Sequence, residues 1–488
     1  MKRGLVLVLL ALFPIPAAWA HVGNKDVFEQ VTAGPYKLFV TVRPPDVIPG
    51  VATVEVRTSG PAVSGMRITP IPLTGEASKH PPTSDPMKVS AADPAFFTGS
   101  LWLMASGSWQ VRIEVNGAGG KQTANIPVAA MPLSILPMQR ALGITLGVLG
   151  LFLVLSMAGI VAAAVREARL PPGSAPSPDR RRRALIASAA ALAVMALFVY
   201  GGDRWWNVEA AGYSHAIYRP LALQPSISGN TLDLAIVGYE DPDNPRRSRA
   251  NDDLLPDHGR PMHLYAIREP GMDAVFHLHP ALVSPGELRM TLPSMPAGRY
   301  RLYGDIVHAS GFPETLTATL EVPGDLPSSP LAAEDASAAP PALAAGELGP
   351  VYRLPDGYAM AWDRPAELTA NTAYAFRFHL LDLQGKPAQD MEPYLGMAGH
   401  AAFVKVDGTS FAHTHPEGSA AMQAMELANP GAMPGMDASG ASGSAAQQPV
   451  SSTVEFPYGF PSPGRYRIFI QMKHGGTVET GVFDADVR

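Results

Sequence analysis

Two pairs of histidines, each separated by one residue and followed by proline, stand out in the second half of the chain. His277 and His279 lie in the sequence FHLHP, and His413 and His415 lie in FAHTHP. In a β-strand, side chains at positions i and i+2 point to the same face, with Cα atoms roughly 6.5–7 Å apart. Each pair can therefore direct two imidazoles at one metal ion.

Further candidate ligands occupy matching positions around each pair. His263 precedes His277 by 14 residues, and His400 precedes His413 by 13. His308 and His474 each follow the glycine of a repeated GRYR sequence by ten residues. Met472 shares a strand face with His474, and Asp305 could orient the His308 ring from the outer shell. The candidate metal ligands are His263, His277, His279, His308, His400, His413, His415, His474, Met397 and Met472.

The chemistry of these candidates is restricted by the absence of cysteine from the chain. Disulfides, iron–sulfur clusters and thiolate metal sites are therefore excluded. Imidazole and thioether together suit copper in both oxidation states, whereas sites of three histidines also hold zinc. We expect a copper ion ahead of zinc or nickel. The alternative is that duplication has copied surface histidines or hydrogen-bonded core histidines that bind no metal.

The matching positions indicate two copies of one β domain, at residues 215–325 and 348–488. A first strand at 231–237 in one copy matches 373–380 in the other. The Pro/Ala/Ser-rich segment 326–347 is the predicted linker. The second copy carries an insertion of about thirty residues after His415, with methionines at 422, 425, 433 and 436 among small residues. Such a composition buries little, so we expect these methionines to be exposed or loosely packed.

The first part of the chain is a predicted β-sandwich at residues 21–130. Alternating strands at 36–42, 52–57 and 109–115 are separated by proline-rich turns. Residues 1–20 have the basic start, apolar centre and small-x-small end of a signal peptide, so the mature chain would begin at His21. His21 is a further candidate chelator through its α-amine and imidazole, with His80 or Met87 as helpers. A histidine left at this position by cleavage is the simpler alternative.

Two apolar segments predict transmembrane helices. Residues 141–165 contain no charge over 25 positions, and residues 184–200 are shorter and precede Trp205 and Trp206. The loop between them, residues 166–183, carries six arginines against two acidic residues, so we expect it in the cytoplasm and both large parts in the periplasm of a bacterial cytoplasmic membrane. The net charge of −6 and the lack of a basic, aromatic stretch exclude a nucleic-acid partner.

The histidine motifs of the C-terminal half resemble a known group of exported bacterial proteins. The run from Asp257 to Leu264 with FHLHP, and its partner from Tyr394 to His400 with FAHTHP, resemble the YtkA-like and FixH-like group. That resemblance covers about half of the chain and implies small immunoglobulin-like β domains found near copper-handling and respiratory-oxidase genes. The N-terminal domain is generally similar to CopC-like sandwiches, but it lacks their Met-rich loop and a second well-spaced histidine.

We therefore predict a mainly β protein with three immunoglobulin-like or cupredoxin-like β-sandwiches and two transmembrane helices. The expected function is periplasmic copper handling from a membrane anchor: tolerance, storage or delivery to a cuproenzyme. The alternative is a non-catalytic scaffold or assembly factor that docks envelope or respiratory-complex proteins. Neither a GxSxG nor an HExxH motif is present, so we expect no enzyme. A hydrolytic or redox activity at an open metal position is a third possibility, with no substrate indicated.

Overall fold

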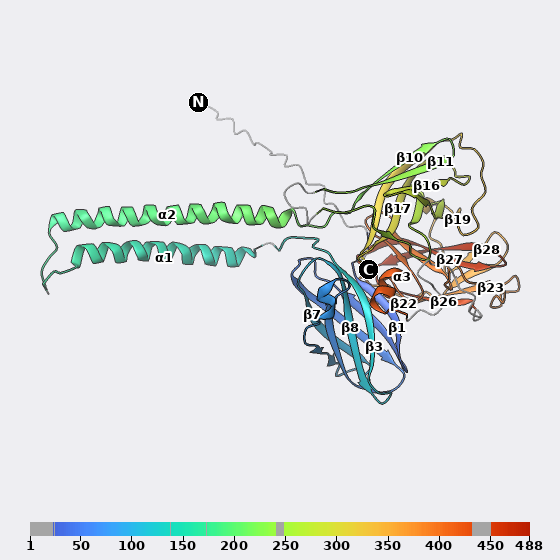
Figure 1. The fold of residues 1–488 in the computed structure, drawn as a ribbon, viewed down its shortest axis with the longest axis horizontal. Coiled ribbons are helices and arrows are strands. Elements are labelled where there is room, and N and C mark those ends of the chain that lie inside the picture. Colours follow the sequence, from blue (N-terminus) through green and yellow to red (C-terminus); the bar gives the residue numbers. More distant parts are fainter. Residues whose placement is uncertain (1–22, 24, 137, 172, 241–247, 432–449) are drawn as a thin grey trace, which may run out of the picture. The chain divides into compact units, whose positions relative to one another are not determined.

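The computed structural model describes residues 23, 25–136, 138–171, 173–240, 248–431 and 450–488. It divides into two compact units: residues 132–218, and the β-rich remainder on both sides of that segment (Figure 1). The prediction of a mainly β chain with two long apolar helices is confirmed. The predicted signal peptide and His21 lie outside the described residues.

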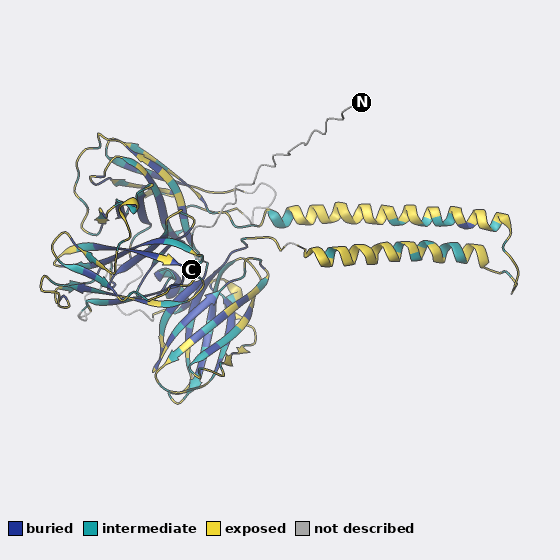
Figure 2. Ribbon diagram, turned by 180° about the vertical axis from the view of Figure 1, so that it is seen from behind, coloured by how far each residue is buried: buried dark blue, intermediate teal, exposed yellow. Residues whose placement is uncertain are grey.

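The helical unit contains two adjacent helices, α1 (Arg140–Glu167) and α2 (Pro178–Ser214). Both are long and apolar enough to cross a membrane, and most of their side chains are exposed (Figure 2). Ser188 Oγ donates a 3.2 Å hydrogen bond to the Ala158 carbonyl between them. The second helix begins before the apolar segment 184–200, because Ser177 caps it, Pro178 lies in its first turn and the arginine run 180–183 is already helical.

The N-terminal β domain consists of two sheets around one apolar core. The first sheet has the order β1 (Val27–Ala33), β2 (Tyr36–Arg43), β3 (Gly50–Ser59), β7 (Phe96–Leu103), β6 (Lys88–Val89). The second has the order β5 (Asp85–Pro86), β4 (Val63–Pro72), β8 (Gly107–Gly117), β9 (Gln122–Ala130). Met87 packs in this core, and the His80 side chain is exposed to solvent beside the short helix η1 (Glu76–Lys79). Met87 is therefore a core residue, which is at odds with its suggested role as a helper ligand of His21.

The first C-terminal copy, named repeat 1, also has two sheets. One has the order β10 (Ala222–Ser228), β11 (Thr231–Val237), β16 (Glu287–Thr291), β15 (Ala281–Ser284). The other has the order β12 (Leu254–Leu255), β17 (Gly298–His308), β13 (His263–Arg268), β14 (Val275–Leu278), β19 (Ala336–Ala338), with β18 (Pro313–Val322) also paired to β17.

Repeat 2 has the corresponding pair of sheets. One has the order β20 (Val351–Arg353), β21 (Ala359–Trp362), β22 (Tyr374–Leu381), β26 (Thr453–Tyr458). The other has the order β23 (Met391–Glu392), β27 (Gly464–His474), β24 (His400–Lys405), β25 (Phe411–Thr414), with β28 (Thr477–Val487) also paired to β27. In both repeats the strand of the first histidine pairs with the strand of the histidine pair that follows.

The histidine-bearing sheets of the two repeats pack against each other. On β13, Leu264 and Ala266 enter the core of repeat 1, whereas Tyr265 and Ile267 enter a separate cluster that also contains residues of β24, β25 and β27. The Tyr303 ring of repeat 1 stacks on the Phe411 ring of repeat 2, with centroids 4.4 Å apart. Both faces of these strands are therefore buried, one in the repeat's own core and the other between the repeats.

A buried ion pair reinforces this contact. Arg467 on β27 donates to both carboxylate oxygens of Asp484, at 2.8 and 3.0 Å, and neither side chain is exposed. The Arg467 guanidinium also donates to the backbone carbonyls of Met272 and Pro341, on the repeat 1 side of the contact. All three nitrogens of the guanidinium thus donate hydrogen bonds at the junction of the repeats.

Replacing Arg467 with methionine is expected to destabilise the β unit by about 3 kcal/mol, because the Asp484 carboxylate stays buried without its main partner. Denaturant unfolding of the full chain in detergent measures the loss. Arg377→Met is the matched control: its partner Glu455 and its own side chain are partly exposed, so the expected change is below about 1 kcal/mol. Equal losses in the two variants would contradict this assignment.

The predicted linker and the insertion both contribute ordered structure. Segment 326–347 contains β19, which adds to the edge of β14, and the short helix η3 (Leu343–Ala345). The insertion contains α3 (Met422–Ala428), in which Met422 and Met425 are buried. The expectation of exposed methionines is therefore wrong for these two, and Met433 and Met436 lie outside the described residues.

The position of α3 explains why its methionines are buried. The side chain of Asn429 donates to the Asn125 backbone carbonyl on β9 of the N-terminal domain. Leu73 of that domain packs with Ala424 and Ala428. On the other side, the Gln423 backbone N–H donates to Asp257 of repeat 1. The insertion thus fills the junction of the three β domains.

Candidate metal centre

Seven histidines gather between the two repeats, and six of them are sequence candidates. The alternation of β13, β14, β24 and β25 places their histidines on the faces that meet, while Phe276 and Leu278 point into the core of repeat 1. The members of this cluster, here named the histidine cluster, are His258, His263, His277, His279, His400, His413 and His415. The histidines predicted to form two separate sites therefore lie together in one cluster.

The first group of three lies within repeat 1. The ring centroids of His263, His277 and His279 are 4.6–5.4 Å apart, and their nearest ring nitrogens all lie within 4.8 Å of one another. His263 Nδ1 and His277 Nε2 are separated by only 3.2 Å. Two nitrogens bound to one ion at 2.0–2.1 Å in tetrahedral geometry would be about 3.3 Å apart.

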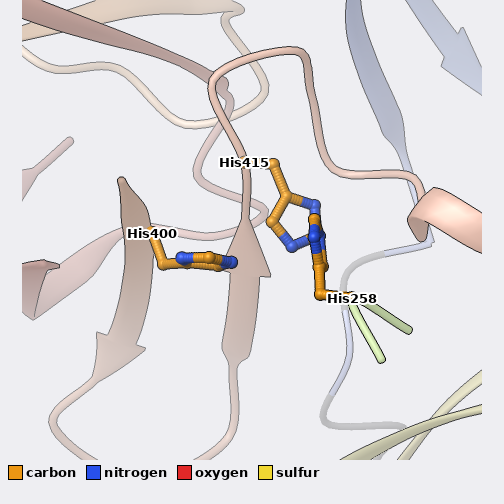
Figure 3. Close-up of side chains that lie close together, drawn as sticks. All are labelled: His258, His400 and His415. Carbon is orange, nitrogen blue, oxygen red and sulfur yellow. The ribbon is translucent and has the colours of Figure 1, made fainter. Parts of the chain in front are cut away.

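The second group combines both repeats, as Figure 3 shows for His258, His400 and His415. Their rings point toward one another, with centroids 4.7–5.2 Å apart. His400 and His415 belong to repeat 2. His258 reaches across from a tight turn of repeat 1, where it adopts a φ of 49° followed by Gly259 at 74°. Such a pair of positive φ angles is typical of a type I′ turn.

His413 lies between the two groups. Its ring centroid is 5.1 Å from that of His263 and 4.8 Å from that of His415. His413 Nδ1 is 3.4 Å from a carboxylate oxygen of Asp305, on β17 of repeat 1. In the reverse direction, His277 Nδ1 lies 2.7 Å from Gln471 Oε1, on β27 of repeat 2. Asp305 therefore lies beside His413 rather than His308, and each repeat places a polar side chain next to a histidine of the other.

The hydrogen bonds of His263 and His277 decide where their protons lie. His263 Nε2 is 3.1 Å from the Asp257 backbone carbonyl, which can only accept, so Nε2 carries the proton and Nδ1 a lone pair. His277 Nδ1 faces the amide oxygen of Gln471, which also accepts from Tyr265, so His277 Nε2 carries a lone pair. Two lone pairs then face each other at 3.2 Å. This arrangement is repulsive unless a cation lies between them.

Other ring nitrogens of the cluster are buried without a hydrogen bond. They are His258 Nε2, His279 Nε2, both nitrogens of His400, His413 Nε2 and His415 Nε2. Buried polar atoms in folded proteins are almost always paired, since an unpaired one costs about 1–3 kcal/mol. Such a concentration at one place indicates a centre built for a ligand.

Six histidines of the cluster are held in their neutral form by their surroundings. Burial lowers the pKa of His263, His277, His279, His400 and His415 well below the ordinary value, and the neighbouring histidines lower it further. Burial also lowers the pKa of His258. Neutral imidazole is the form that binds metals. These rings are therefore available as ligands at neutral pH without competition from protons.

Two rings have the outer partners that usually accompany metal ligands. His279 Nδ1 donates to Asp335 at 2.9 Å, and His258 Nδ1 donates to the Leu395 carbonyl at 3.0 Å. Each bond fixes the tautomer that leaves Nε2 free for a ligand. Burial raises the pKa of Asp335 to about 6, despite the bond from the His279 backbone. Asp335 belongs to the predicted linker, which thus takes part in the centre.

A cavity of about 110 Å³ lies beside the cluster, at the junction of the three β domains. His413 and His415 form part of its wall, together with the acidic side chains of Asp26, Asp257 and Asp305. The histidine cluster is therefore not sealed on this side. Its acidic side chains, Glu314 included, outnumber its one basic side chain, Lys25, so the wall would attract a cation.

Four sequence candidates lie away from the cluster. His308 donates to Asp253 and Glu314, and His474 approaches Asp390 and Asp356. Burial lowers the pKa of His308, but the bonds to Glu314 and Asp253 outweigh this and raise it above its ordinary value. Met472 packs in the core of repeat 2, and Met397 is buried in the turn opposite His258.

His258 was missed because its counterpart in repeat 2 is Leu395. Both residues occupy the same position of equivalent turns, with φ of 49° and 50°. The pattern of histidines repeated in both copies therefore does not include His258. The available signal was the His-Gly dipeptide five positions before His263, since a non-glycine residue at positive φ requires a specific reason.

Comparisons with known proteins concern both repeats together. The family model described as "Domain of unknown function (DUF8832)" matches residues 244–324 and 352–488, which include the whole histidine cluster. No curated protein is similar enough to match the sequence. The resemblance to the YtkA-like, FixH-like and CopC-like groups stays a prediction.

Solved structures that align with the chain are similar to it only loosely. An engineered protein shows 19% identity over 19% of each chain, with a TM-score of 0.15. The tetra-tandem repeat of a large adhesion protein shows 8% identity over 91% of this chain and 71% of its own, with a TM-score of 0.17. A Salmonella alpha-2-macroglobulin variant shows 8% identity over 94% of this chain, with a TM-score of 0.21, and the chain spans 24% of its length.

Proposed function

We propose that the chain is a membrane-anchored copper-binding protein of the bacterial envelope, with the histidine cluster as its copper site. The facing lone pairs of His263 and His277, 3.2 Å apart, carry this proposal. A proton between them would also relieve the repulsion, but burial lowers the pKa of both rings well below the ordinary value. The facing lone pairs therefore support a metal cation between the two rings.

The arrangement of the rings favours two ions side by side. Each group of three supplies a set of converging nitrogens, and His413 adjoins both groups. The residues that would hold the first ion are His263, His277 and His279, and those for the second are His258, His400 and His415. Because the second set is drawn from both repeats, ion binding would also fasten the repeats to each other.

Copper is favoured over other metals by the donor set. All seven side chains offer imidazole nitrogen, and Cu(II) has the highest affinity for such ligands among the divalent first-row metals. Zinc is the main competitor, since three-histidine sites hold it as well. Burial of the rings suits storage or sequestration, and release would go through the cavity beside His413 and His415.

The proposed placement in the cell rests on the sequence. The signal peptide and the six arginines between the two helices support a cytoplasmic-membrane protein with both β-rich parts in the periplasm. Export to an oxidising compartment is consistent with an all-nitrogen centre that lacks thiolates. The partners that this proposal implies are a cuproenzyme or a respiratory complex that receives the copper.

Metal analysis of the full chain, purified from its own membranes without added metal, tests the proposal. We expect copper at one to two ions per chain, with the nitrogen hyperfine structure of imidazole ligands in the electron paramagnetic resonance spectrum after oxidation. Zinc at the same stoichiometry would replace copper as the metal. Protein free of metal that also fails to bind micromolar Cu(I) or Cu(II) would overturn the proposal and favour a docking scaffold.

A further inference from the structure

A second group of ligating side chains lies at the end of β27, away from the histidine cluster. Asp356, His474 and Glu479 place one ligand atom each within 4.8 Å of one another. His474 follows Gln471 by three residues, so it lies about 10 Å further along the strand and on the opposite sheet face. Gln471 contacts the cluster, whereas His474 stacks on the Tyr358 ring at 4.2 Å.

The geometry around His474 differs from that of a simple ion pair. The ring is buried, and Nδ1 donates to Asp390 at 3.2 Å. Nε2 lies 3.1 Å from an oxygen of Asp356, yet makes no hydrogen bond because the direction is unsuitable. A nitrogen and an oxygen this close, but not aimed at each other, are arranged like two ligands of a common ion. Asp390 then has the role of the outer carboxylate that fixes the tautomer.

Repeat 1 shows the same position without such a site. The strand register makes His308 equivalent to His474, Asp253 to Asp390 and Glu314 to Glu479. His308 bonds to both acidic partners in repeat 1. Arg249 donates to both oxygens of Glu314, at 2.9 and 2.6 Å, and so neutralises it. The guanidinium thus supplies the positive charge that a metal ion would otherwise supply.

Repeat 2 lacks this guanidinium among the residues that the structure describes. No arginine or lysine there forms an ion pair with Asp356, Asp390 or Glu479, and Asp356 adds a third carboxylate. Burial, followed by the charge of Asp356, raises the pKa of Glu479. Three carboxylates around one imidazole therefore leave an excess of negative charge at a partly exposed position.

We propose that Asp356, His474 and Glu479 bind a divalent transition-metal ion of the zinc type, separately from the histidine cluster. One imidazole with two carboxylates and room for water is a ligand set that zinc accepts, and the imidazole disfavours Mg²⁺ and Ca²⁺. The partial exposure of Asp356 makes this ion exchangeable with solvent, in contrast to the buried cluster. The site does not depend on what the cluster binds.

Equilibrium dialysis of the full chain in detergent against Zn²⁺, in excess Mg²⁺, tests the site. Asp356→Asn and Glu479→Gln should each lower the bound Zn²⁺ by one ion per chain at micromolar free Zn²⁺. Asp363→Asn is the matched control, because Asp363 pairs with His379 in the same repeat without further acidic partners. Asp363→Asn should leave the number of bound Zn²⁺ ions per chain unchanged. A melting curve of each variant confirms that it is folded.

The outcomes separate this site from the cluster. His415→Ala removes a ligand from the histidine cluster only. In this variant the Zn²⁺ ion at Asp356, His474 and Glu479 should still be bound. Wild-type stoichiometry and affinity in both Asp356→Asn and Glu479→Gln would overturn the proposal and leave His474 as a structural ion pair. Loss of Zn²⁺ in Asp363→Asn as well would overturn it too, since surface carboxylates in general would then be responsible.

Discussion

Replacing His400 with leucine is expected to weaken copper binding at the His258, His400 and His415 group more than 100-fold without lowering the stability of the metal-free protein. His400 is fully buried, and neither of its ring nitrogens has a hydrogen-bond partner. Leucine removes a ligand together with two unpaired polar atoms, each of which costs about 1–3 kcal/mol when buried. Loss of an outer partner alone lowers metal affinity about 10–100-fold, so loss of a ligand should exceed this.

Competition with a copper chelator measures the affinity, and denaturant unfolding of the metal-free chain measures the stability. Both measurements are needed, because substitution of a histidine that only supports the core would lower the stability of the metal-free protein. Destabilisation of the metal-free protein by more than about 2 kcal/mol, with copper binding intact, would show that His400 is such a residue.

His308→Leu is the matched control, and it should behave in the opposite way. Its ring bonds to Asp253 and to the buried carboxylate of Glu314, so its removal takes one partner from Glu314, which keeps Arg249 and the Leu221 backbone N–H. We expect a loss of about 1–3 kcal/mol with unchanged copper affinity. The two histidines hold candidate positions in the same sequence pattern, and only their surroundings separate a ligand from a structural residue.

The strand pattern was sufficient to place most of the cluster. His277 and His279 share a face because of their spacing, and the pairing of β13 with β14 brings His263 beside them. The alternation of side chains along a strand does not show which domain covers the face that carries the histidines. After the histidine, β13 (HLYAIR) and β24 (HAAFVK) each have four successive apolar or aromatic residues, which indicates strands buried on both faces. Read in this way, the sequence predicts that another domain covers the histidines.

Strand alternation also explains why two of the predicted ligands lie away from the cluster. His308 and His474 lie three residues beyond Asp305 and Gln471 on their strands, so they point to the opposite face. Repetition of a residue in both copies indicates a shared environment but not a shared function. The cross-domain contacts of His258 and of Asp335 depend on how separate segments pack, which local spacing does not determine.

Lowering the pH from 7 to 5 is expected to destabilise the metal-free β unit steeply. Burial lowers the folded-state pKa of His258, His263, His277, His279, His400 and His415, whereas unfolded histidines keep a pKa near 6.5. The unfolded state therefore binds more protons, and stability falls as the pH drops below about 6.5. Each such imidazole contributes up to about 1.4 kcal/mol per pH unit, so the six together would remove up to about 8 kcal/mol per pH unit.

Hydrogen exchange of β24 and β27 in the metal-free chain, followed between pH 7 and 5 after correction for intrinsic rates, measures this loss. Copper should shift the loss to lower pH, because ions bound by the neutral rings stabilise only the folded state. His308 does not add to the effect, since its raised pKa makes it a stabilising residue at acid pH. Protection that stays constant down to pH 5 without metal would mean that the rings accept protons in place. The cation between His263 and His277 would then be a proton rather than a metal.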